Sequence, residues 1–183
     1  MEKFSIDEEK HSICGFIDRL TESDLFNIEP LPFRRTLSSK EVDVIKLNLG
    51  AQFSIPLFTS GLPSLESSQW FPITEFRPEY TEAFNIVDFA AYVGLDTLRA
   101  MFEILNLERV LMIREFGNSN YEVDVDVYDP SYSAIDGGES FTTDREFSFC
   151  IYVSSERTIT FSGRDLLLQI QSVWREWIQF AYR

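Results

Sequence analysis

The stretch between Arg109 and Tyr128 constrains the fold more than any other part of the chain. An apolar run at residues 110–113 is followed by the turn-forming residues Gly, Asn, Ser and Asn at positions 117–120, and then by an alternating pattern over residues 121–128. Alternation with a period of two is typical of a half-buried strand, and two strand patterns around a short turn predict a β-hairpin. We therefore expect an antiparallel sheet that contains this hairpin.

The second strand of the predicted hairpin has two chemically different faces. Successive side chains of a strand point to opposite sides of the sheet, so every second residue shares a face. Three valines on one side would close a core, and three carboxylates on the other would form a row open to solvent. In chain order these residues are Glu122, Val123, Asp124, Val125, Asp126 and Val127.

The acidity of the chain is concentrated around this strand. Thirty Asp and Glu residues against sixteen Lys and Arg residues give a net charge of −14. Half of that charge comes from residues 118–146, which hold one base, Arg145, and eight acids. The acids are Glu122, Asp124, Asp126, Asp129, Asp136, Glu139, Asp144 and Glu146. Nucleic acids and anionic membranes require a basic surface, so neither is the expected partner, whereas a basic protein is.

The remaining patterns predict an α+β fold. With 183 residues and 44% hydrophobic content, the chain can bury one core, and a single domain over residues 1–183 is expected. Apolar spacing predicts further strands over residues 41–49, 52–58, 146–154 and 157–161. Helical spacing predicts helices over residues 6–20, 81–93 and 164–182, with one more beginning at Asp96.

Two long segments, residues 59–80 and 129–144, are rich in Pro, Gly, Ser and Asp and are predicted to be loops. The expected architecture is a mainly antiparallel sheet. Its covered face carries the C-terminal amphipathic helix and the central helix pair within residues 81–107.

The chain lacks the apolar run of roughly 18–20 residues that spans a bilayer. Its first residues, MEKFSIDEEKHS, are charged and do not resemble a signal peptide. A cytoplasmic location is therefore expected, and Cys14 and Cys150 are expected to be free thiols.

The carboxylate row has three interpretations, the first of which is a metal site. An Asp-x-Asp spacing places two carboxylates about 6.6 Å apart on one strand face, and Mg²⁺ or Mn²⁺ is often held this way. A phosphoryl-transfer site also needs a nearby Lys or His. The next base is Arg145, and the one histidine, His11, lies in a predicted helix. We therefore expect no metal and no cofactor.

The second interpretation is a solvated sheet face without function. Two like charges about 7 Å apart repel by only about 0.6 kcal/mol in water, so an exposed acidic row is tolerable. The third is a docking surface for Lys and Arg side chains of a basic protein. The clustering of acids in residues 118–146 favours this interpretation, because an acidic loop would lie beside the acidic strand.

No phosphate-binding glycine loop, nucleophile elbow or zinc-protease motif is present in the sequence, so a non-enzymatic protein is expected. The leading hypothesis is an immunity protein, monomeric, that neutralises a basic toxin domain, with a nuclease as the most natural case. The predicted partner-binding carboxylates are Glu122, Asp124, Asp126, Asp129, Asp136 and Glu139. Trp70, Phe71 or Tyr132 would supply an apolar anchor. The alternatives are a dimeric secretion chaperone and a metal-dependent phosphodiesterase that uses Glu122, Asp124 and Asp126.

Overall fold

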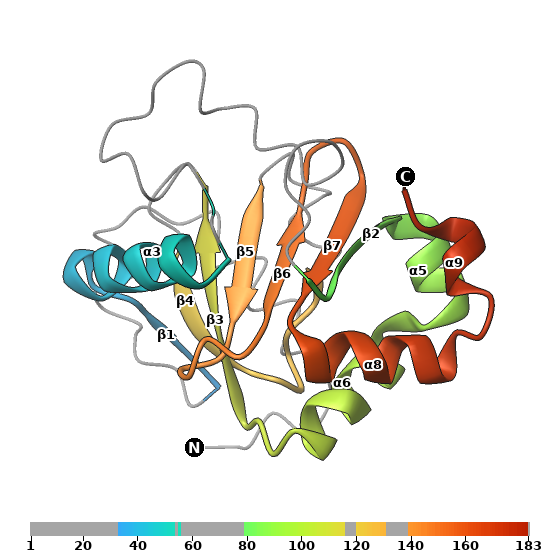
Figure 1. Ribbon diagram of the computed structural model, residues 1–183. Coiled ribbons are helices and arrows are strands. Elements are labelled where there is room, and N and C mark those ends of the chain that lie inside the picture. The colour runs from blue at the N-terminus through green and yellow to red at the C-terminus, as the bar shows by residue number, and fades with distance from the viewer. Residues whose placement is uncertain (1–32, 54, 56–78, 116–119, 131–138, 183) are drawn as a thin grey trace.

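A seven-stranded antiparallel sheet forms the centre of the part of the chain that the computed structural model describes, residues 33–53, 55, 79–115, 120–130 and 139–182 (Figure 1). The strand order is β1-β4-β3-β5-β6-β7-β2, and every pair of neighbours is antiparallel. The strands are β1 (Arg34–Thr36), β2 (Thr81–Asn85), β3 (Arg109–Arg114), β4 (Tyr121–Asp124), β5 (Ser140–Thr143), β6 (Cys150–Val153) and β7 (Thr158–Ser162). With the helices, this confirms the predicted α+β class.

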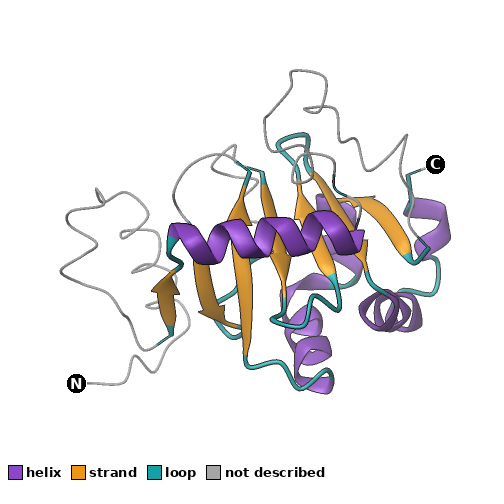
Figure 2. Cartoon of the chain, turned by 60° about the vertical axis from the view of Figure 1, so that its left-hand side comes forward, coloured by secondary structure: helices purple, strands orange, loops and turns teal. Residues whose placement is uncertain are grey.

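Helices cover both faces of the sheet. One face carries a single long helix, which crosses the strands in Figure 2. The other face carries the helices that follow β2 and β7 (Figure 1). The helices are α3 (Ser39–Phe53), α5 (Ile86–Tyr92), α6 (Gly94–Ile104), α8 (Arg164–Val173) and α9 (Trp177–Phe180). The sheet is therefore the middle layer of three.

The larger core lies between the sheet and the helices α5, α6 and α8. Aromatic side chains from these helices and from the strands pack on one another, with ring centroids 4.9 Å apart for Phe84 and Trp174 and 5.0 Å apart for Phe89 and Phe161. The alternate residues Val110, Tyr121, Val123, Ile151, Ile159 and Phe161 of the strands belong to this core. Burial of this much apolar surface is the main stabilising contribution to the fold.

The smaller core lies between the sheet and α3. Val42, Ile45, Leu49 and Phe53 recur every three or four residues along α3, so they form one buried stripe. They pack on the strand residues Leu111, Ile113, Phe141, Cys150 and Tyr152. Because both faces are covered, the central strands are buried on both sides and do not show the simple alternation of a half-exposed sheet.

The prediction of a strand over residues 41–49 is wrong, since these residues lie within α3. The run EVDVIKLNL is compatible with the two-residue period of a strand and with the 3.6-residue period of a helix. The prediction relied on its alternation. A local signal for the helix was present: Ser38 and Glu41 form a capping box. The Ser38 N–H donates to Glu41 Oε2 at 2.9 Å, and the Glu41 N–H donates to Ser38 Oγ at 3.4 Å.

The predicted helix over residues 81–93 begins too early. Residues 81–85 form β2, which pairs with β7, and the helix α5 starts only at Ile86. Asn85 marks the change, because its side-chain oxygen accepts a hydrogen bond from the Val87 N–H at 2.8 Å. Pairing with an edge of the sheet outweighed the helical spacing of the apolar residues.

The predicted loop over residues 129–144 contains a strand, β5, which is central in the sheet. Its sequence, SFTT, has little apolar content, yet all four residues are buried because β3 and β6 pair with it on either side. The strand predicted over residues 146–154 is shorter, covering only 150–153. The strand predicted over residues 157–161 is confirmed as β7.

The C-terminal segment forms two helices, since α8 ends at Val173 and α9 follows after a turn at residues 175–176. The predicted helix at residues 6–20 lies outside the described residues, as do most of residues 52–80. Among the helices that the structure describes, none has the length and apolar character needed to cross a bilayer.

The predicted hairpin is confirmed as β3 and β4, which pair with Leu111 opposite Glu122. The second strand ends earlier than expected, however. It stops at Asp124, and residues 125–127 form a turn in which the Val127 N–H donates to the Asp124 carbonyl at 3.1 Å. The alternating sequence therefore continues beyond the strand that it predicts.

Candidate functional site

The first residue of the predicted carboxylate row, Glu122, lies inside the protein. Leu111, its partner across the hairpin, faces α3, so Glu122 lies on the same covered face of the sheet. Its side chain is 1% exposed. Arg35 Nε donates to Glu122 Oε2 at 2.6 Å, and Arg145 Nε and Nη2 donate to Glu122 Oε1 at 2.9 and 2.5 Å. The prediction that Glu122 belongs to a solvent-facing row is therefore wrong.

The same arginine connects Glu122 to the start of α3. Arg35 Nη2 donates to Glu41 Oε1 at 2.8 Å, and the other oxygen of Glu41 accepts hydrogen bonds from Ser38. The resulting series, Arg145–Glu122–Arg35–Glu41, is called the charge ladder below. It joins the β5–β6 connection, β4, β1 and α3, four segments that are distant in the sequence.

Both carboxylates of the charge ladder are held in the ionised form. Burial alone would raise the pKa of Glu122, but hydrogen bonds from Arg145 and Arg35 outweigh it and lower the pKa. The hydrogen bond from Arg35, helped by those from Ser38, lowers the pKa of Glu41 to about 2. Neither group is suited to proton transfer near neutral pH, so the ladder acts as a fixed set of charges.

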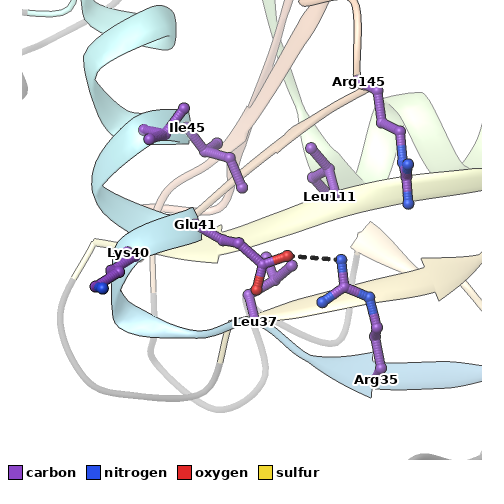
Figure 3. A pocket seen from close by; sticks show the side chains of 8 residues that line it. Arg35, Leu37, Lys40, Glu41, Ile45, Leu111 and Arg145 are labelled. Atoms are coloured by element: carbon purple, nitrogen blue, oxygen red, sulfur yellow. Dashed lines mark hydrogen bonds and ion pairs between the residues drawn. The ribbon is translucent and has the colours of Figure 1, made fainter.

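A pocket of about 400 Å³ opens beside the ladder, between α3 and β3 (Figure 3). It is called the α3 pocket here. Apolar side chains and three cationic groups surround it, and Arg35 and Arg145 approach it from opposite sides in Figure 3. The lining residues are Arg35, Leu37, Lys40, Glu41, Val44, Ile45, Leu111 and Arg145.

A second pocket, of about 320 Å³, lies on the other side of Arg145 and is lined by Asn106, Leu107, Glu108, Arg109, Glu122, Asp144, Arg145 and Glu146. Its acids come from strand β4 and from the α6–β3 and β5–β6 connections, which meet at one end of the sheet. Arg109 is opposite Asp124, Leu111 is opposite Thr143, and the Val125 N–H donates to the Glu108 carbonyl at 3.0 Å.

The carboxylates at this end of the sheet are Glu108, Asp124, Asp126, Asp144 and Glu146, and they are called the acidic end. The two arginines among them already have carboxylate partners. Arg109 Nε lies 2.8 Å from Asp124 Oδ1, and Arg145 is bound to Glu122. Asp144 is buried and accepts hydrogen bonds from the N–H and Oγ of Ser148, at 2.7 and 2.5 Å, whereas Glu108, Asp126 and Glu146 are exposed. The field at this end is therefore negative.

Of the other predicted partner-binding acids, Asp129 is half-buried beyond the turn that follows β4, and Glu139 lies at the opposite end of the sheet. Glu139 accepts a hydrogen bond from Ser155 Oγ at 2.9 Å. The structure therefore does not bring Glu139 together with Asp124 and Asp126. Asp136, Trp70, Phe71 and Tyr132 lie outside the described residues.

Glu139 also forms a carboxyl–carboxylate pair with Glu115. The pKa of Glu115 is raised, mainly by burial of the carboxyl group and to a smaller extent by the neighbouring Glu139. Burial would raise the pKa of Glu139 as well, but hydrogen bonds from Glu115, Ser155 and Tyr152 outweigh it and lower that pKa. When the pair shares one proton, these opposite shifts favour its position on Glu115.

Sequence reasoning missed the roles of Arg35, Glu108 and Arg145. Arg145 was treated only as a distant base, although the β3–β5 pairing brings it to Glu122. Arg35 had no local signal at all, because its partner lies 87 residues away. Only the capping box at Ser38 and Glu41 could have been found in the sequence.

The described residues contain no group of three or more His, Cys, Asp or Glu side chains arranged to hold a metal ion. The two oxygens of Glu122 accept hydrogen bonds from Arg35 and Arg145, and Asp124 is paired with Arg109. A cation bound by Glu122 and Asp124 would have to displace these three guanidinium groups.

The chain matches no known family model, and no curated protein or solved structure is significantly similar to it.

Proposed function

We propose that this protein is a non-enzymatic binding protein that uses the acidic end to engage the Lys and Arg side chains of a basic protein. The observation that carries the proposal is the meeting of Glu108, Asp126 and Glu146 at one end of the sheet from three separate connections. The nearby arginines are already bound to Asp124 and Glu122, so they leave the field of this end negative.

The most natural form of this activity is that of a cytoplasmic immunity protein, monomeric, that neutralises a basic toxin domain such as a nuclease. A nuclease holds the phosphates of its substrate with Lys and Arg side chains, and a carboxylate surface competes for the same groups. The net charge of −14 increases the rate of encounter with a cationic protein. The sheet anchors the connections that carry these carboxylates, which lowers the cost of ordering them when a partner binds.

Charge reversal tests the proposal. The double variant Asp126→Lys, Glu146→Lys changes two exposed carboxylates of the acidic end. The candidate partner is the protein encoded immediately upstream, and the readouts are its association rate in stopped-flow mixing and its toxicity in co-expressing cells. The association rate at low salt should fall at least about tenfold, and protection of the cells should be lost.

The matched control is the double variant Glu156→Lys, Glu176→Lys, which makes the same change in net charge at two exposed positions away from the acidic end. It should associate at a rate within about twofold of the wild type. An equal loss in both variants would show that only net charge matters. Lack of binding by the wild-type protein would contradict the proposal itself.

A further inference from the structure

The α3 pocket differs in charge from the rest of this acidic protein. Three of its lining residues are cationic, Arg35, Lys40 and Arg145, in a chain whose net charge is −14. Two carboxylates, Glu41 in its lining and Glu122 beneath the arginines, offset two of these charges. The pocket therefore retains one net positive charge, and within the described part of the chain Lys40 has no ion-pair partner.

The arginines of the pocket keep hydrogen-bond donors beyond those used in the charge ladder. A guanidinium carries five N–H donors, and toward the described residues Arg145 uses its Nε and one Nη2 donor, both on Glu122. Arg35 uses Nε on Glu122 and one Nη2 donor on Glu41. Since the Arg145 side chain is 68% exposed, its remaining donors are accessible to a ligand. The ladder also holds both groups in place, so their position is set before a ligand arrives.

The remainder of the pocket is apolar. Leu37, Ile45 and Leu111 form its base, and Val44, which is 57% exposed, extends the apolar surface along α3. The volume of about 400 Å³ lies within the range of small-molecule sites. An exposed valine beside such a base gains from contact with an apolar group.

We infer that the α3 pocket binds a small monocarboxylate with an apolar tail, whose carboxylate lies between Arg35 and Arg145 and whose tail covers Val44 and Leu111. One negative charge matches the one net positive charge of the pocket. A phosphate dianion is a poorer match, because its charge exceeds the net charge of the pocket and it makes no contact with the apolar base. This inference is independent of the proposed function, since it concerns the other side of Arg145.

Calorimetric titration of the full-length protein with octanoate tests the inference, with octylamine and inorganic phosphate as comparison ligands. Octanoate should bind saturably at one site. Its dissociation constant should be below about 1 mM, an affinity typical of a small ligand that buries one short apolar tail. Octylamine has the same tail and the opposite charge, and phosphate has charge without a tail, so both should bind at least about tenfold more weakly. Equal binding of octanoate and octylamine would overturn the inference.

Two variants with matched controls on the same helix locate the site. Lys40→Gln and Val44→Ser change residues that line the pocket, whereas Lys46→Gln and Leu47→Ser change α3 residues that do not line it. The first two should weaken octanoate binding by at least about fivefold, and the controls should remain within about twofold of the wild type. Absence of saturable octanoate binding, or equal effects in all four variants, would contradict the inference. Far-ultraviolet circular dichroism confirms that each variant is folded.

Discussion

Glu122 and Asp126 are four residues apart in the same acidic run, yet their carboxylates lie in opposite surroundings. Glu122 is buried and is bound by two arginines, whereas Asp126 is exposed in the turn that follows β4. The difference arises from what surrounds each residue. The side chains of Arg35 and Arg145 lie against the Glu122 carboxylate, whereas the strand has already ended at Asp126.

This comparison shows that identical chemistry in one run of sequence can serve two purposes. At Glu122 the negative charge fixes the positions of α3, β1 and the β5–β6 connection, because each depends on a charged contact in the charge ladder. At Asp126 the side chain is exposed, and its charge contributes to the field of the acidic end. Stability measurements should therefore separate the two residues clearly.

The largest effect is expected from Glu122→Gln. Glutamine fills the same space but cannot neutralise Arg35 and Arg145, so two guanidinium groups would face each other across an uncharged side chain. The free energy of unfolding, measured by urea denaturation at pH 7, should fall by about 3 kcal/mol. Glu156→Gln, in an exposed turn, is the control and should change it by less than about 0.5 kcal/mol. Equal effects would mean that the ladder does not hold the layers together.

A smaller, pH-dependent effect is expected from Glu41→Gln. The Glu41–Arg35 pair is partly exposed, with 41% and 33% of the side chains accessible, so solvent screens it and the loss at pH 7 should be about 1 kcal/mol. Because the pKa of Glu41 is lowered to about 2, its ionised form stabilises the fold above its ordinary pKa of 4.5. The difference between wild type and variant should therefore shrink as the pH falls from 4.5 to 2. Urea titrations at pH 7, 4 and 3 measure it, and a constant difference would contradict this cause.

The smallest effect is expected from neutralising the acidic end with Asp126→Asn and Glu146→Gln. Both residues are exposed, so loss of their charges should change the free energy of unfolding by less than about 0.5 kcal/mol. The same urea titration provides the measurement. A loss comparable to that of Glu122→Gln would place these carboxylates in the packing and would remove the contrast with Glu122.

The hairpin β3–β4 could be predicted because its pattern is local: an apolar run, a turn and an alternating run follow one another in the sequence. The strand β7 and the helix α6 could be predicted for the same reason, because their patterns are also local. By contrast, β5 has no local signal, because SFTT is held in the sheet by hydrogen bonds from two neighbouring strands. Its burial depends on partners that sequence periodicity does not reveal.

The error at Glu122 follows directly from the error at α3. With residues 41–49 interpreted as a strand, no helix was assigned to the second face of the sheet, and the carboxylates of that face were expected to meet solvent. Recognition of the Ser38–Glu41 capping box would have supplied the missing helix. Even so, the partners of Glu122 would have remained unknown, since Arg35 and Arg145 lie 87 and 23 residues away from it.

The sequence by itself determined the α+β class, the hairpin and the strong local acidity, because these properties depend on composition and on spacing within short windows. Only the tertiary structure decided which carboxylates are exposed and which arginines lie between them, since those depend on contacts between distant segments. Thus Glu122 became an internal anchor of the charge ladder, while Asp126, Glu108 and Glu146 were brought to one end of the sheet. The physical reason is that burial of a charge is tolerated only where the fold supplies a partner for it.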